Sequence, residues 1–299
     1  MNVQEEITRL KEEKNAIILV HNYQRPKVQD VADYLGDSLG LSRKASNTNA
    51  DMIVFCGVTF MAETAKILSP DKTVLLPRKE AGCPMADMVT SSDVIALKEK
   101  YPDAKVVSYV NTNADVKAVT DVCCTSSNAV EVVRNIEADR VIFVPDRNLA
   151  SYVGRFVDKE IIPWDGYCYV HERITKDEVL KAKEKYPDAL LLVHPECNPP
   201  VIDIADEVLS TQGMVDFVGE SDNKRFLIGT EEGILYRLKK ENPDKEFYPA
   251  GTPKICQNMK RTTLDDVYLA LKDEQYPIEI PDEIISSAKR ALEAMLQYV

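Results

Sequence analysis

The heptapeptide KEKYPDA occurs twice in this chain of 299 residues, at 98–104 and at 183–189. The flanking segments 102–133 and 187–218 align without a gap, and 14–45 is a third copy, 88 positions before the first of them. An internal repeat constrains the fold more strongly than composition does, because every copy must build the same supersecondary unit. The chain is therefore expected to contain three equivalent units.

The second half of each unit repeats more faintly, in segments that begin at Met52, Arg140 and Arg225. Each complete unit is typical of a strand, a polar loop, a helix, a second loop and a second helix, followed by strand, helix and strand. Alternating strands and helices favour parallel sheets with right-handed crossovers. The predicted fold class is α/β, with three homologous three-layer αβα sandwich domains around a pseudo-threefold axis. The predicted domains are 1–85, 86–172 and 173–259, with the helical segment 260–299 packing on the first domain and completing it.

Polar residues fall in register where the predicted strands end. At the end of the first strand of each unit the aligned residues are His21, Tyr109 and His194. Two positions later they are Tyr23, Asn111 and Glu196. Functional crevices of parallel sheets lie at the carboxyl ends of the strands. Because His, Tyr and Glu are candidate general acids and bases, their convergence predicts an active site with several proton transfers.

One cysteine follows the last strand of each unit, namely Cys83, Cys168 and Cys256. Three converging thiolates supply three ligands to a tetrahedral zinc or to three irons of a [4Fe-4S] cluster, and a fourth position stays open. His171 lies three residues after Cys168, so a closed structural zinc site of three cysteines and His171 stays an alternative, as does a His171 that faces the substrate. The cysteines without register are expected to be buried apolar residues, Cys56 in a strand. They are Cys56, Cys123, Cys124 and Cys197.

A third set of aligned residues stands at predicted helix starts: Ser38, Ser126 and Thr211. Each is a plausible N-cap. Three helix N-termini that point at one place would also bind an anion, because their free N–H groups and positive dipole ends converge there. The pattern predicts a small substrate with several negative charges, in the form of carboxylates, phosphate or both.

The net charge of −12 argues against nucleic acid and anionic membranes as partners, since both need clustered Lys and Arg. The longest apolar runs are far shorter than a membrane span, and the first residues have no signal-peptide pattern. We therefore expect a cytoplasmic protein. Seven cysteines, an odd number, in a reducing compartment argue against a disulfide framework.

In several segments along its length the chain resembles the quinolinate synthase A family. The matching segments are HNYQRPKVQDVADYLGDSLGLSRKA, VNTNADVKAVTDVCCTSSNAVEVV, PDRNLA, VHPECNPPVIDIADEVLSTQGM, IGTEEGILYRL and NMK. The resemblance implies three α/β domains with one cysteine each on a [4Fe-4S] cluster. It also implies the condensation of iminoaspartate with dihydroxyacetone phosphate to quinolinate, with loss of phosphate and two waters, in de novo NAD biosynthesis.

The same resemblance implies roles for individual residues. The cluster ligands would be Cys83, Cys168 and Cys256, and the open iron would act as a Lewis acid. The active-site residues would be His21, Tyr23, Tyr109, Asn111, His194 and Glu196, with Glu196 the favoured acid or base. The carboxylate and phosphate anchors would be Ser38, Ser126 and Thr211. Thr230 and Glu231 of GTEEG are predicted to line the same cavity.

Partners implied by the resemblance are the two small-molecule substrates and the enzyme that produces iminoaspartate. Two other function classes stay open on the residues alone. One is a non-catalytic anion-binding protein with a structural zinc site of three cysteines and a histidine. The other is a different iron-sulfur hydro-lyase that acts on a small hydroxy acid.

Overall fold

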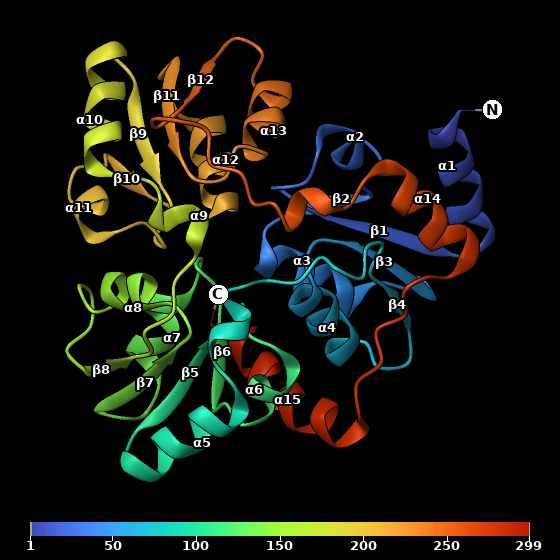
Figure 1. Ribbon diagram of the computed structural model, residues 1–299, viewed down its shortest axis with the longest axis horizontal. Helices are drawn as coiled ribbons and strands as arrows, with labels where there is room; N and C mark the ends of the chain where they lie inside the picture. The colour runs from blue at the N-terminus through green and yellow to red at the C-terminus, as the bar shows by residue number, and fades with distance from the viewer. Residues whose placement is uncertain (1, 299) are drawn as a thin grey trace.

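The computed structural model describes residues 2–298 and contains three four-stranded sheets. All paired strands within the sheets are parallel, and the order in each sheet is the same: second, first, third and fourth strand of the repeat. Helices pack around each sheet, and the three sheets surround a common centre (Figure 1). The predicted α/β class with three αβα repeats is confirmed.

The three repeats contain equivalent elements in the same order. The first has α1 Val3–Glu13, β1 Ala16–His21, α2 Pro26–Gln29, β2 Tyr34–Gly36, α3 Ser38–Asn47, β3 Met52–Cys56, α4 Thr59–Leu68 and β4 Thr73–Leu75. The second has η1 Ala86–Met88, α5 Ser91–Lys100, β5 Lys105–Tyr109, α6 Ala114–Ala118, β6 Val122–Cys124, α7 Ala129–Asn135, β7 Arg140–Val144, α8 Arg147–Val153 and β8 Glu160–Pro163. The third has α9 Tyr169–Glu172, α10 Lys176–Lys185, β9 Leu190–Val193, α11 Pro199–Ile202, β10 Glu207–Val208, α12 Thr211–Glu220, β11 Arg225–Gly229, α13 Ile234–Glu241 and β12 Glu246–Pro249. The chain ends with η2 Met259–Arg261, α14 Leu264–Asp273 and α15 Asp282–Met295.

The prediction of three strands per unit was wrong by one strand. The segment predicted as the second loop contains a short edge strand in every repeat, namely β2, β6 and β10. These strands have three, three and two residues. Such short segments show no alternation of apolar and polar residues, and strand prediction depends on that alternation.

The central strands are apolar on both faces because helices cover both sides of each sheet. In β3, with the sequence MIVFC, all five residues are buried, including Cys56 as predicted. The equivalent strands β7 and β11 contribute the buried rings of Phe143 and Phe226. The repeated apolar strands thus build one core layer per repeat.

The identical heptapeptides adopt the same local structure. They end α5 and α10 and lead into β5 and β9. The cap residues Tyr101 and Tyr186 have nearly identical backbone angles, φ −129° and ψ 70° against φ −129° and ψ 68°. The repeat in sequence is therefore a repeat of a helix end and turn.

The two C-terminal helices pack in different places. Helix α14 packs on α1 and β3 of the first repeat, whereas α15 contacts α6 and β6 of the second repeat and α4 of the first. The spacing of the buried residues of α15 is that of an amphipathic helix; they are Ile285, Ala288, Ala291, Leu292 and Met295. The domain limits at 85 and 172, and the assignment of 260–299 to the first domain, stay predictions. Their outermost residues, Met1 and Val299, lie outside the described part of the chain.

Within residues 2–298, none of the helices has the length and the apolar character that crossing a bilayer requires.

Candidate active site

One cavity at the centre of the molecule receives side chains from all three repeats. Twelve residues that the sequence singled out line it: His21, Tyr23, Ser38, Cys83, Tyr109, Asn111, Ser126, Cys168, His194, Glu196, Thr211 and Cys256. They come from the last residues of strands, such as His21 and Tyr109, and from the loops and helix starts that follow the strands. The carboxyl ends of three separate parallel sheets therefore meet around one site, as expected for this topology.

Thr230 and Glu231 are not among the residues that line the cavity, contrary to the prediction. Thr230 lies behind the wall, where its hydroxyl meets the Tyr23 hydroxyl at 2.5 Å and Nε2 of His171 at 2.8 Å. The Glu231 carboxylate accepts hydrogen bonds from the backbone N–H groups of Gly233 (2.7 Å) and Cys256 (3.0 Å). Both side chains are turned toward protein groups and support the wall.

The predicted N-caps were wrong. Asp37 and Ser210 cap α3 and α12 through the N–H groups of Gly40 and Gly213, so Ser38 and Thr211 are the first residues inside their helices. Ser126 lies in the turn before α7. A residue with a side-chain oxygen directly precedes Ser38 and Thr211 and takes the capping role. The hydroxyl groups of Ser38 and Thr211 therefore do not cap their helices.

The three cysteines occupy equivalent positions at the start of short helical turns. Cys83 precedes η1, Cys168 caps α9 and Cys256 precedes η2. Burial raises the pKa of each thiol. Backbone N–H groups two or three residues further along, such as those of Ala86, His171 and Met259, donate to the sulfurs and oppose this shift. The N–H groups favour the thiolate, the form that binds metal, but burial outweighs them and the pKa of each thiol stays raised.

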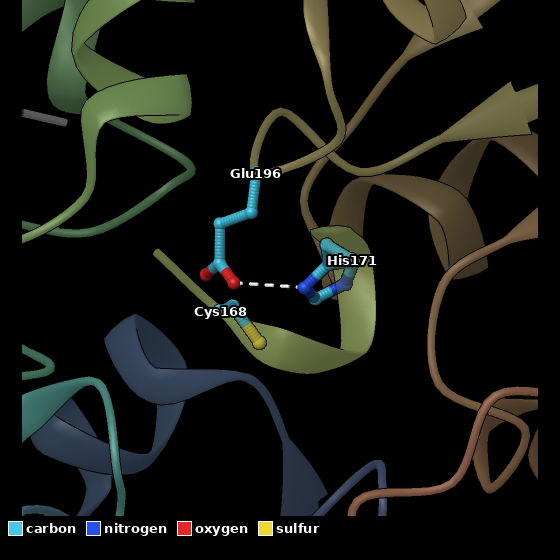
Figure 2. Close-up of side chains that lie close together, drawn as sticks. All are labelled: Cys168, His171 and Glu196. Carbon is cyan, nitrogen blue, oxygen red and sulfur yellow. Dashed lines mark ion pairs between the residues drawn. The ribbon is translucent and has the colours of Figure 1, made fainter. Parts of the chain in front are cut away.

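The spacing of possible ligand atoms bears on the kind of metal centre. Within residues 2–298, one group of three candidate ligands lies with all its ligand atoms within 4.8 Å: Cys168, His171 and Glu196 (Figure 2). The three cysteine sulfurs do not form such a group. A tetrahedral zinc at ~2.3 Å from each sulfur would hold them about 3.8 Å apart. The arrangement speaks against one zinc on all three cysteines, whereas a cluster binds each sulfur through a different iron.

Glu196 is the hub of the buried polar groups. Oε1 accepts a hydrogen bond of 2.6 Å from the Tyr109 hydroxyl and lies 3.8 Å from Nδ1 of His194. Oε2 lies 2.8 Å from Nδ1 of His171 (Figure 2). This contact is short, but Nδ1 has no well-aligned hydrogen-bond acceptor. The ring of His171 also stacks on His194, with centroids 4.6 Å apart.

His171 extends the network away from Glu196. Nε2 of its ring contacts the Thr230 hydroxyl, which in turn contacts the Tyr23 hydroxyl. The four groups form a continuous line from the Glu196 carboxylate to the Tyr23 phenol. Two of its three contacts are hydrogen bonds, and the third, between Nδ1 of His171 and Glu196, is close but not aligned. The line can carry a proton between its ends once the His171 ring aligns with the carboxylate.

Burial and neighbouring charges set the protonation states. Burial on its own raises the pKa of Glu196, but His171, His194 and the hydrogen bond from Tyr109 outweigh it and lower the pKa to about 2. Burial lowers the pKa of His21 and of His194, each to about 3. Near neutral pH the cavity therefore holds an ionised Glu196 beside two neutral imidazoles.

The sequence left two roles open for His171, a zinc ligand or a residue that faces the substrate, and did not predict its contacts with Glu196 and Thr230. His171 has no counterpart in the other repeats, so the register could not identify it. The available signal was composition, since the chain has three histidines and all three line this cavity. Asn148 of PDRNLA was also missed: it donates to the backbone carbonyl of Glu196 at 3.2 Å.

The fold and the site define a class of protein: a three-repeat α/β protein with one central cavity lined by thiols, imidazoles and a carboxylate. The family model of the quinolinate synthetase A protein matches residues 5–297, and the chain belongs to this family.

Several relatives are similar over nearly their whole length. A protein named quinolinate synthase from Methanoregula boonei is 56% identical over 294 residues, which cover 98% of this chain and 97% of that protein. Another of that name, from Geotalea uraniireducens, is 55% identical over 294 residues, with the same coverage. A third, from Thermodesulfovibrio yellowstonii, is 54% identical over 296 residues, which cover 99% of this chain and 98% of that protein.

Proposed function

We propose that this protein is a quinolinate synthase that condenses iminoaspartate with dihydroxyacetone phosphate to quinolinate, with loss of phosphate and two waters, as a step of de novo NAD biosynthesis. The observation that carries the proposal is the convergence of twelve predicted site residues from three repeats on one cavity. Membership of the quinolinate synthetase A family adds to it. The reaction needs binding sites for carboxylates and phosphate, groups that move protons and a centre that assists dehydration.

The anionic groups of the substrates would bind at the helix starts. The hydroxyl groups of Ser38, Ser126 and Thr211 line the cavity, and Ser38 and Thr211 begin helices of ten residues. Helix N-termini favour negative charge through free N–H groups and the helix dipole. Two carboxylates on iminoaspartate and one phosphate on dihydroxyacetone phosphate match three hydroxyl-bearing positions, of which Ser38 and Thr211 lie at helix N-termini and Ser126 lies in the turn before α7.

Asn111 is a further substrate contact in this proposal. It lines the cavity, and its buried Oδ1 has no hydrogen-bond partner among the described residues. A buried acceptor without a partner costs free energy, about 1–3 kcal/mol for an ordinary polar group. A donor on the substrate, such as an imine N–H or a hydroxyl, would remove that cost.

The line from Tyr23 through Thr230 and His171 to Glu196 would move protons. Its contacts of 2.5, 2.8 and 2.8 Å are within the range of proton transfer. Glu196 is ionised, so it can accept a proton relayed through the imidazole of His171, and its low pKa means that it would pass the proton on and not retain it. Tyr109 and His194 contact the same carboxylate and would orient it. His21, edge-on to Tyr23 at 4.6 Å between centroids, would act beside Tyr23.

The residues present fit a [4Fe-4S] cluster held by Cys83, Cys168 and Cys256, because each sulfur lies at the cavity and receives backbone N–H groups. When bound through three cysteines, such a cluster supplies one iron with an open position that acts as a Lewis acid toward a hydroxyl or carboxylate. The protein's own part is to hold the three thiolates and to keep the acid and base groups next to them.

We also propose that the protein works in the cytoplasm and receives iminoaspartate from the enzyme that produces it. The net charge of −12 supports small-molecule substrates and not nucleic acid or an anionic membrane surface.

The test is an anaerobic incubation of the purified, iron-loaded protein with iminoaspartate and dihydroxyacetone phosphate. Release of quinolinate and phosphate in equal amounts is expected. A brown, iron-containing protein that forms no quinolinate would contradict the proposal in favour of another hydro-lyase. A colourless protein with one tightly bound zinc would favour the anion-binding alternative.

A further inference from the structure

The three short helices after the strand-end loops are in register. They are α2, α6 and α11, and they begin at Pro26, Ala114 and Pro199. The fourth residue of each helix differs between the repeats: it is Gln29 in α2, Lys117 in α6 and Ile202 in α11. All three are buried, and Lys117 is fully buried.

Lys117 binds the loop that carries two of the cavity residues. Its ammonium group donates a hydrogen bond to the backbone carbonyl of Thr112. The Thr112 hydroxyl donates to the carbonyl of Tyr109 at 3.1 Å, and Asn111 lies between the two. Lys117 therefore fixes, from behind, the backbone from which Tyr109 and Asn111 reach the cavity.

Gln29 makes the equivalent contact in the first repeat. Its Nε2 donates to the carbonyl of Gln24 at 2.8 Å, and Gln24 is the register equivalent of Thr112. The same nitrogen also lies within hydrogen-bond distance of the carbonyls of Asn22 (3.2 Å) and Gly233 (2.9 Å). Two repeats with different residues at this position thus bind the same carbonyl.

The third repeat holds its loop differently. Ile202 has no donor, and Asn148 of α8 instead binds the carbonyl of Glu196. Each strand-end loop of the cavity is therefore held by at least one buried side-chain nitrogen, and the first loop is also held by Lys260, whose Nζ donates to the Tyr23 carbonyl at 2.6 Å.

Lys117 and Gln29 are unrelated residues that bind the equivalent carbonyl, which indicates that this carbonyl is the target in the first two repeats. In the third repeat Asn148 binds the carbonyl one register position earlier.

The charge of Lys117 has a separate explanation. An ammonium group is expensive to bury unless an opposite charge is near. Glu63 of α4 in the first repeat is the largest favourable charge acting on Lys117, and its Oε2 accepts a hydrogen bond of 3.0 Å from the N–H of Ala114. The ring of Phe60 lies 5.5 Å from the ammonium nitrogen. Glu63 thus balances the positive charge of Lys117, while the N–H groups of the ammonium hold the loop through the Thr112 carbonyl.

We propose that Lys117 is a positioning residue for the reaction: by donating to the Thr112 carbonyl it holds Tyr109 and Asn111 in place in the cavity, and its charge is needed only to balance Glu63. The inference rests on the proposed function, since it assigns Lys117 to that site. It predicts that a neutral donor can replace Lys117 when Glu63 is also neutral, as Gln29 does in the first repeat.

Two double variants separate the donor from the charge. Lys117→Gln with Glu63→Gln removes both charges and keeps a donor; Lys117→Met with Glu63→Gln removes both charges and the donor. The glutamine pair should retain kcat to within roughly threefold, and the methionine pair should lose roughly tenfold or more, because small displacements of reacting groups are costly. Amide hydrogen exchange in residues 110–113 should be faster in the methionine pair alone.

Wild-type protein in the same assay shows whether quinolinate forms at all, so a failure of the proposed function is distinct from a failure of this inference. Equal kcat and equal exchange in the two double variants would overturn the positioning role, as would a loss of kcat in both. If the Lys117→Met, Glu63→Gln protein does not fold, amide hydrogen exchange in the Lys117→Gln, Glu63→Gln protein tests the positioning role. Wild-type protection of residues 110–113 supports the inference, and lost protection overturns it.

Discussion

The phenol of Tyr109 donates a hydrogen bond of 2.6 Å to the Glu196 carboxylate, and the two residues come from different repeats. Tyr109 ends β5 and Glu196 follows β9. Burial, together with the charge of Glu196, raises the pKa of Tyr109 well above its usual value, so the phenol stays a donor. Neither repeat can form this contact alone, which explains why the cavity lies where the repeats meet.

Glu196→Gln should abolish most quinolinate formation and leave the fold intact. The amide has nearly the same shape and can still accept from Tyr109, but it cannot accept a proton delivered through His171. The measurement is kcat beside the thermal unfolding midpoint and the visible spectrum. Normal turnover in this variant would remove Glu196 from the proton-transfer steps.

The line from Tyr23 to Glu196 predicts non-additive effects. Thr230→Val removes the hydroxyl that joins Tyr23 to His171, and Tyr23→Phe removes the end of the same line. Each variant should lower kcat by roughly 10²-fold, the typical contribution of a positioned acid or base. The double variant should be no slower than the slower single variant, because groups that act as one unit do not add. Multiplied losses would show that the two residues act separately.

Folding stability should fall as the pH falls below about 6.5, the ordinary pKa of histidine. The folded-state pKa values of His21 and His194 are about 3, below that of the unfolded chain. Between these values the unfolded chain binds more protons, so each histidine removes up to about 1.4 kcal/mol of stability per pH unit. Glu196, with a pKa of about 2, adds to the loss below about 4.3, the ordinary pKa of glutamate.

Urea unfolding at pH 7, 6 and 5 measures this slope. His21→Asn removes one of the two titrating groups and keeps an acceptor for the N–H of Tyr23, which now donates to Nδ1 of His21 at 3.2 Å. Its slope should be shallower than that of the wild type by close to one proton. Parallel slopes would mean that His21 is not buried in the neutral form.

Gly233→Ala should disturb Tyr23 from a position outside the cavity. A Cβ at Gly233 would lie 2.7 Å from the backbone carbonyl of Tyr23 and 2.6 Å from Nζ of Lys260. Such crowding costs typically about 1–3 kcal/mol of stability and should lower kcat by moving the Tyr23 phenol. Gly219→Ala in α12 is the matched control, since its Cβ would meet nothing within 4 Å. Equal unfolding midpoints for the two variants would contradict the predicted crowding.

The repeat register predicted most of the fold and most of the cavity lining. Offsets of 88 and 85 positions suffice to align strand ends, cysteine loops and helix starts, because equivalent residues of equivalent units face the same centre. Two kinds of feature could not be predicted from the repeat register: short edge strands and residues without an equivalent in the other repeats. The edge strands β2, β6 and β10 are too short to leave a periodic signal.

The other kind concerns residues that break the repeat. His171 reaches the cavity and Asn148 binds the backbone carbonyl of Glu196, both without an equivalent in the other repeats, and Asp37 and Ser210 take the caps predicted for their neighbours. Thr230 and Glu231 sit at a strand end, but Thr230 contacts the side chains of Tyr23 and His171, and Glu231 accepts from the backbone N–H groups of Gly233 and Cys256. These details depend on side-chain direction in three dimensions, which alignment of strand ends does not determine.

We propose that one cysteine from each repeat holds a single [4Fe-4S] cluster. Iron and acid-labile sulfide should be measured in anaerobically purified single variants, with Cys83, Cys168 or Cys256 replaced by Ser, beside Cys56→Ser and Cys197→Ser as controls. The control thiols are fully buried, and burial raises the pKa of both. We expect that replacing Cys83, Cys168 or Cys256 removes the cluster, and that both controls keep the iron and sulfide content of the wild type. Equal cluster content in all five variants would contradict it.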